Sequence, residues 1–155
     1  MNSLSPSTLA YLAQAGWKVG RKVWTIKYRA FLTGEGYAWF PAVAEFLAEF
    51  GGLLIEFKRE DGGPDTIDLD ACEASSGFDS RWVTEDYIQR IGQTKFCAIG
   101  QAYSNHMLLF MDEAGRVYGG FDDFLCFIGN SGAEAIEVIC SNQRARIKEI
   151  PELPE

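Results

Sequence analysis

The chain has 155 residues and a formal net charge of −8, and 47% of its residues are apolar. This length suits one domain with a sizeable core, while the acidic excess opposes nucleic-acid or anionic-membrane binding and favours a basic partner. No apolar run approaches the ~20 residues that span a bilayer, and residues 1–10 lack a signal-peptide pattern. We therefore expect a cytoplasmic protein.

Two helices are predicted at the start of the chain. The first begins at Ser5–Pro6, where serine is a good N-cap and proline suits the first helical position, and it ends at Gly16. Residues 24–32 match helical spacing but include strand-prone residue types. We prefer a helix there because Gly34 and Gly36 follow where a helix is expected to stop.

A third helix is predicted over residues 41–50, where apolar side chains recur at i, i+3, i+4 and i+7. We expect Gly51 to adopt the left-handed conformation that closes a helix, followed at once by a buried strand over 53–57. This joint contains no Ser, Cys, His or Lys that could act as a nucleophile or general base. It therefore indicates a scaffold and favours binding over catalysis.

The middle of the chain is predicted to contain a hairpin, a loop and a helix. The turn-rich segment 60–65 joins the first strand to a second at 66–69. Residues 70–80 are small and acidic and contain Gly and Ser, which predicts an exposed loop. A helix should follow over 81–91 and end at Gly92.

Three short strands are predicted next, at 95–99, 106–112 and 116–119, with a hairpin loop at 113–115. The apolar residues within 121–128 have helical spacing instead.

A final helix is expected through residue 141, because Ser131 and Glu134 form a capping box. Residues 146–155 are predicted to be a frayed tail. This order of elements favours a single α+β domain over residues 4–145, with a mostly antiparallel sheet packed against N- and C-terminal helices.

Several short motifs, taken in order, resemble one known family. They are Ala15–Trp17 (AGW), Gly20–Arg21, the proline-led helix–strand joint at 41–55, and the aromatic hairpin at 108–118. Over roughly residues 9–139 the chain resembles the third subgroup of the SUKH superfamily, most of whose members are bacterial immunity proteins that neutralise secreted polymorphic toxins. The resemblance implies a curved sheet packed against helices and a toxin domain as partner.

The charge is uneven along the chain. Every charged residue before Glu35 is basic, and these residues are Lys18, Arg21, Lys22, Lys27 and Arg29. Such a run is typical of the solvated side of a helix and a loop, and phosphate binding is the alternative.

Catalytic and metal-binding patterns are missing from the sequence. The four cysteines are widely spaced and form no C-x-x-C pair, so we interpret them as reduced, mostly buried thiols and predict no metal site or cofactor. His106 is the only histidine, and a Cys–His dyad with Cys97 or Cys126 is the catalytic alternative to a histidine at the edge of a loop. No phosphate loop, H-E-x-x-H or G-x-S-x-G motif occurs. We predict that the protein is not an enzyme.

Two acidic groups and two aromatic residues are the candidate partner-binding elements. The first group follows the first strand and comprises Asp61, Asp65, Asp68, Asp70, Glu73 and Asp79. The second flanks the later hairpin and comprises Asp112, Glu113, Asp122 and Asp123. Trp82 and Tyr103 adjoin loops and could anchor an interface. The alternative is that the carboxylates keep loops solvated and the aromatic side chains belong to the core.

From the resemblance and these residues we predict an immunity protein that binds a cognate toxin domain and occludes its active site or substrate access. The carboxylates would steer a basic toxin and select it, and they favour a nuclease over a lipase or protease. Two alternatives stay open: a protein-interaction or regulatory module with the same fold, and a small enzyme. The oligomeric state is not predicted.

Overall fold

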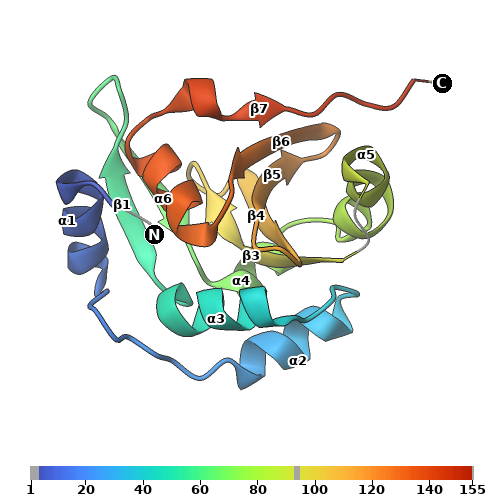
Figure 1. Ribbon diagram of the computed structural model, residues 1–155, viewed down its shortest axis with the longest axis horizontal. Coiled ribbons are helices and arrows are strands. Elements are labelled where there is room, and N and C mark those ends of the chain that lie inside the picture. The colour runs from blue at the N-terminus through green and yellow to red at the C-terminus, as the bar shows by residue number, and fades with distance from the viewer. Residues whose placement is uncertain (1–3, 93–94, 155) are drawn as a thin grey trace.

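In the part of the chain that the structure describes, seven strands form one open antiparallel meander whose order in the sheet follows the chain. Figure 1 shows how the strands and helices are arranged. The computed structural model describes residues 4–92 and 95–154. The strands are β1 (Leu54–Lys58), β2 (Pro64–Asp68), β3 (Phe96–Ala102), β4 (Met107–Asp112), β5 (Val117–Phe121), β6 (Phe124–Gly129) and β7 (Lys148–Glu149). The predicted α+β class with an antiparallel sheet is therefore confirmed.

Helices precede, interrupt and follow this sheet. They are α1 (Pro6–Ala15), α2 (Ile26–Gly34), α3 (Pro41–Phe50), α4 (Ala71–Ser76), α5 (Ile88–Ile91) and α6 (Gly132–Cys140), with a π-helical segment η1 (Trp82–Tyr87) and a 3₁₀ turn η2 (Arg144–Arg146). The predicted caps are confirmed: Ser5 accepts from the backbone of Thr8, and Ser131 from that of Glu134. None of the described helices is both long and apolar enough to cross a bilayer.

The joint between α3 and β1 differs from the prediction in one residue. Gly51 has φ −57°, and it is Gly52, with φ +84°, that adopts the left-handed conformation. Gly51 is required for a different reason, because a Cβ there would lie 2.4 Å from the carbonyl oxygen of Leu47. The chain therefore leaves the helix in an extended conformation and turns one residue later.

The prediction of an exposed loop over residues 70–80 is wrong in its first half. Asp70 caps α4 by accepting from the backbone N–H of Glu73 at 3.1 Å, and Ala71, Ala74 and Ser75 are buried. The small side chains that suggested a loop are those that let a short helix pack closely against β3. The helix predicted over 81–91 forms as η1 followed by α5.

The helical spacing within 121–128 is also misleading, because Phe121 ends β5, residues 122–123 form a turn, and β6 begins at Phe124. Its partner is β5, with Phe121 opposite Phe124 across the two-residue turn Asp122–Asp123. A short apolar run such as 124–128 can form either a helix or a buried strand, and pairing with β5 decides between them.

Part of the segment expected to be a frayed tail is attached to the sheet. Lys148 and Glu149 pair with β6, and the guanidinium of Arg90 donates hydrogen bonds to the carbonyls of Ile150 and Pro151.

Helical elements cover both faces of the central strands, which explains why β3 and β4 are buried at every position. Consecutive residues of a strand face opposite sides. On β4, Phe110 stacks against Tyr87 of η1 at 5.5 Å between ring centroids, while Met111 lies beside α3 and the start of α6. Tyr118 extends the aromatic stack on the Phe110 side at 5.7 Å.

Candidate partner-binding surface

Three hairpin turns gather at one end of the sheet, because consecutive antiparallel strands return every second turn to the same side. These are the turns β1–β2 (59–63), β3–β4 (103–106) and β5–β6 (122–123). The segment after α6 joins them, since the side-chain amide of Asn142 donates to the carbonyl of Lys58 at 2.9 Å. We call this region the turn end.

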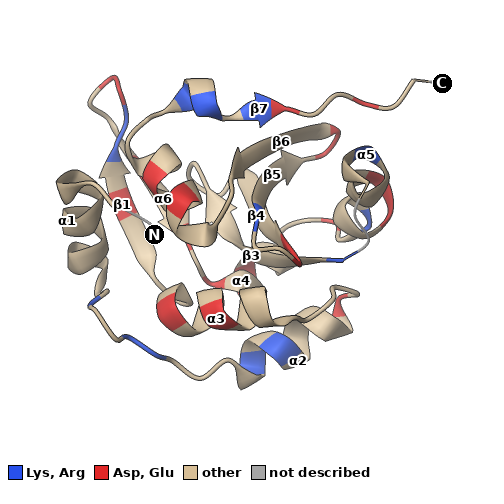
Figure 2. Ribbon diagram, viewed as in Figure 1, with Lys and Arg blue, Asp and Glu red and all other residues tan. Residues whose placement is uncertain are grey.

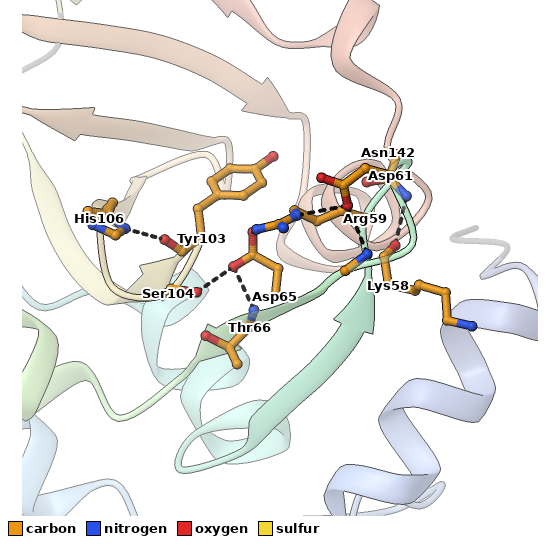
Figure 3. Close-up of polar contacts among 10 residues, drawn as sticks. Lys58, Arg59, Asp61, Asp65, Thr66, Tyr103, Ser104, His106 and Asn142 are labelled. Carbon is orange, nitrogen blue, oxygen red and sulfur yellow. Dashed lines mark hydrogen bonds and ion pairs between the residues drawn. The ribbon is translucent and has the colours of Figure 1, made fainter.

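A polar network links two of these turns (Figure 3). The carboxylate of Asp65 accepts from the hydroxyl of Ser104 and from the backbone of Thr66, both at 2.9 Å. The guanidinium of Arg59 lies 3.9 Å from Asp65 and 3.3 Å from Asp61. Because Asp65 is only 5% exposed, it holds the turns together and is not available to a partner. Asp61 is exposed.

Backbone strain is concentrated at the turn end. Five non-glycine residues of the described chain have positive φ: Tyr103 (55°), Ser104 (56°), Asn105 (68°), Asp122 (49°) and Asn142 (57°). All five lie in the turns or the segment that form the turn end. A left-handed L-residue costs about 1–2 kcal/mol, somewhat less for Asn and Asp, and such residues cluster where a surface is shaped for binding.

The same end of the molecule contains a groove of about 280 Å³, which we call the turn-end groove. Its lining residues are Tyr103, Met107, Phe121, Phe124, Arg144 and Ile147. Phe121 is 42% exposed and stacks on Phe124 at 4.9 Å. Arg144 makes no ion pair with any described residue. The Gly63 amide and Arg59 lower the pKa of the Asp61 carboxyl most, and Arg144 lies close enough to lower it further. Aromatic residues and arginine in a pocket are the usual energetic anchors of protein interfaces.

Of the predicted site residues, the structure brings four to this groove. Tyr103 lines it, Asp122 and Asp123 form the turn between its two phenylalanines, and Asp61 neighbours Arg144. Burial raises the pKa of Tyr103 to about 12, against the lowering effect of Arg144, so its hydroxyl is neutral at physiological pH.

The other predicted residues lie elsewhere. Asp68, Asp70 and Glu73 surround the start of α4. Asp79 and Trp82 line a hollow of about 300 Å³ beside η1, where the hydrogen bonds from Arg81 lower the pKa of Asp79 to about 2. None of these five residues lines the turn-end groove.

Asp112 and Glu113 sit in the β4–β5 hairpin, at the opposite end of the sheet. Asp112 is fully buried and accepts from the backbones of Ala114 and Arg116, the Arg116 guanidinium and the Tyr118 hydroxyl. Its carboxylate stabilises the hairpin and, like Asp65, is not available to a partner. Glu113 is exposed and lies 3.6 Å from Lys95.

The histidine and the thiols are not arranged for nucleophilic catalysis. The imidazole of His106 is exposed, and its Nδ1 lies 2.8 Å from the carbonyl oxygen of Tyr103 (Figure 3). Burial raises the pKa of Cys97 and of Cys126 to about 12, which disfavours the reactive thiolate. In the described part of the chain, neither of these two thiols forms a hydrogen bond with His106.

Sequence reasoning missed most of the groove. Phe121 was assigned to a helical pattern, and Phe124, Met107 and Arg144 carry no local signal that separates a groove from a core. The aromatic pair on either side of Asp122–Asp123 is the one available clue, since a two-residue acidic turn between aromatic residues is compatible with a hairpin.

A family model describing SUKH-3 immunity proteins matches residues 4–142. The chain belongs to the SUKH-3 immunity protein family. Neither curated proteins nor solved structures return a match. Membership confirms the resemblance drawn from the motifs and supports an immunity role for this SUKH-3 protein. Family membership also supports a binding role, since immunity proteins of this kind are generally not enzymes.

Proposed function

We propose that this SUKH-3 protein binds one cognate toxin domain in the cytoplasm and blocks the toxin's active site or its access to substrate. The observation that carries the proposal is the turn-end groove, where anchor-type side chains and strained turns converge in a chain of an immunity family. Strained turns keep the groove in one shape, so little ordering is needed when the toxin binds.

The exposed carboxylates support a basic toxin domain as the partner. Asp61, Asp122 and Asp123 surround the groove, and a basic toxin domain would be steered to them. A nuclease fits best, because its active site presents lysines and arginines that normally hold phosphate. The exposed acids at α4 and η1 would add to long-range attraction, while the buried Asp65 and Asp112 would act only by shaping the turns.

The test is co-expression with the toxin encoded immediately upstream, followed by gel filtration and calorimetry of the purified pair. We expect rescue of growth and a one-to-one complex, and Phe121→Ala should weaken the complex by at least about tenfold. Leu54→Ala is the matched control, since Leu54 is a 50% exposed apolar residue on β1. Undiminished toxicity with no complex refutes the function, whereas a full-strength complex with Phe121→Ala refutes the assignment of the groove.

A further inference from the structure

A second surface, separate from the turn-end groove, combines exposed apolar side chains with positive charge. It consists of residues 18–31, the extended segment before α2 and the start of that helix, and we call it the basic strip. Val19, Trp24 and Ile26 are 87%, 85% and 72% exposed, the highest values among the large hydrophobic residues described. Phe31 adds a further apolar side chain at 38%. Exposed apolar groups gathered in this way indicate an interaction site.

The basic strip is strongly positive in an acidic protein. It carries five cations and no acid, while the other nine basic and twenty-two acidic residues leave the rest of the chain at −13. Arg21 attaches the strip to α3 by donating to the carbonyls of Glu49 and Gly51 at 2.6 and 2.9 Å. The remaining four, Lys18, Lys22, Lys27 and Arg29, form no ion pair inside the described ranges. Figure 2 shows Lys and Arg along α2 and the segment before it, and acidic residues on α3.

A complementary groove lies on the same chain. It has a volume of about 270 Å³ and lies between α3, the β4–β5 hairpin and the start of α6; we call it the α3 groove. Phe46, Phe50 and Met111 provide its apolar lining, and Glu45 and Glu49 make it acidic. Glu45 is exposed and forms no ion pair with a described residue. Charge and shape are therefore opposite to those of the basic strip, whose apolar side chains protrude.

We propose that the protein forms a two-fold symmetric dimer in which the basic strip of each copy lies over the α3 groove of the other. A two-fold contact needs a self-complementary patch. Here the basic strip and the α3 groove both adjoin α3: α3 lines the groove, and the backbone of Val23 in the strip donates to the carbonyl of Ala48 at 2.8 Å. Because the strip–groove contact forms twice in the dimer, the strip and the groove of both copies become buried. The protruding apolar side chains of both copies supply on the order of 1,000 Å². The apolar groove linings Phe46, Phe50 and Met111 are only 7%, 4% and 2% exposed and add little, so the interface is a small one.

The test measures the mass of the purified chain without toxin, by sedimentation equilibrium at low and high salt. We expect a dimer that weakens at least about tenfold in high salt, because screening shortens the range of the strip–groove attraction. Trp24→Ser should weaken it by a similar factor. Lys22→Glu and Glu45→Lys should each give monomers, and mixing these two variants should restore dimers, because each reversed charge then meets its opposite. Lys148→Glu makes the same charge change away from the strip and should leave the dimer intact.

A chain that stays monomeric up to about millimolar concentration overturns the proposal, as does a dimer that ignores both Trp24→Ser and the charge reversals. Binding of monomeric chain to anionic vesicles, lost with Trp24→Ser, would also overturn it by giving the strip a different occupant. Rescue from the toxin is scored separately, so a failed dimer test leaves the immunity function untouched.

Discussion

Replacement of Arg90 should both destabilise the protein and loosen the turn-end groove. The side chain of Arg90 is 3% exposed. Its guanidinium donates to the carbonyls of Asp123 (2.8 Å), Ile150 (2.6 Å) and Pro151 (3.3 Å) and to the carboxylate of Asp86 (3.1 Å). One side chain of α5 thus ties the β5–β6 turn to the C-terminal segment. That turn separates the two phenylalanines of the groove, so the same bonds position the proposed binding surface.

The expected magnitude follows from the number and exposure of these bonds. A hydrogen bond to a charged group contributes about 1.5–3 kcal/mol when the partner is buried. Here the carbonyls lie at the surface and Asp86 is 44% exposed, so water replaces much of what is lost. We therefore expect Arg90→Ala to lower the free energy of unfolding by about 3 kcal/mol in total. Arg90→Lys should cost about 1–2 kcal/mol, because lysine keeps the charge but not the planar fork.

Urea unfolding followed by circular dichroism measures this effect. With a slope of about 2 kcal/mol per molar, Arg90→Ala should move the midpoint by about 1.5 M without changing the slope. Arg81→Ala is the control: Arg81 also pairs with an aspartate, but its side chain is 77% exposed, and no measurable change is expected. A loss below about 0.5 kcal/mol for Arg90→Ala, or full toxin affinity in a clearly destabilised variant, would refute the reasoning.

Two further substitutions test the packing of the fold. Glu137 joins α6 to α1 by accepting from the backbone of Ser5 at 2.6 Å. Burial raises the pKa of this carboxyl, but hydrogen bonds from nearby serine and threonine hydroxyls and from the Ser5 amide outweigh burial, so the pKa lies below its usual value. The ionised Glu137 carboxylate stabilises the fold above the usual pKa of a glutamate, and this stability is lost as the pH falls through the lower pKa of the folded protein. Glu137→Gln should therefore be less stable at neutral pH and lose less stability on acidification. Parallel pH profiles of the melting temperature for the two proteins would contradict this. Gly120→Ala places a Cβ 2.7 Å from the ring of Tyr87 and should lower the free energy of unfolding in urea by about 2 kcal/mol. Gly34→Ala is the control, because no described residue lies close to a Cβ there, and it should leave the free energy of unfolding unchanged. Equal effects of the two substitutions would contradict the packing argument.

Local signals in the sequence determined most of the helices and the family. Serine before a helix supplies its own hydrogen bond to the first turn at Ser5 and Ser131, so these caps act within four residues and need no tertiary context. The same is true of proline at the start of α3. Because the family motifs are built from these joints, the fold class followed from the sequence as well.

Tertiary structure alone decided which residues form the candidate site. Whether residues 124–129 become a strand depends on pairing with β5. Whether Asp65 or Asp112 faces solvent depends on donors that fold against it, such as Ser104 and Tyr118. Arg144 lines the same groove as Tyr103 because the segment after α6 returns to the turn end, where Asn142 donates to the carbonyl of Lys58. Interactions between residues distant in sequence leave no periodic mark along the chain, and for that physical reason the groove could not be predicted from it.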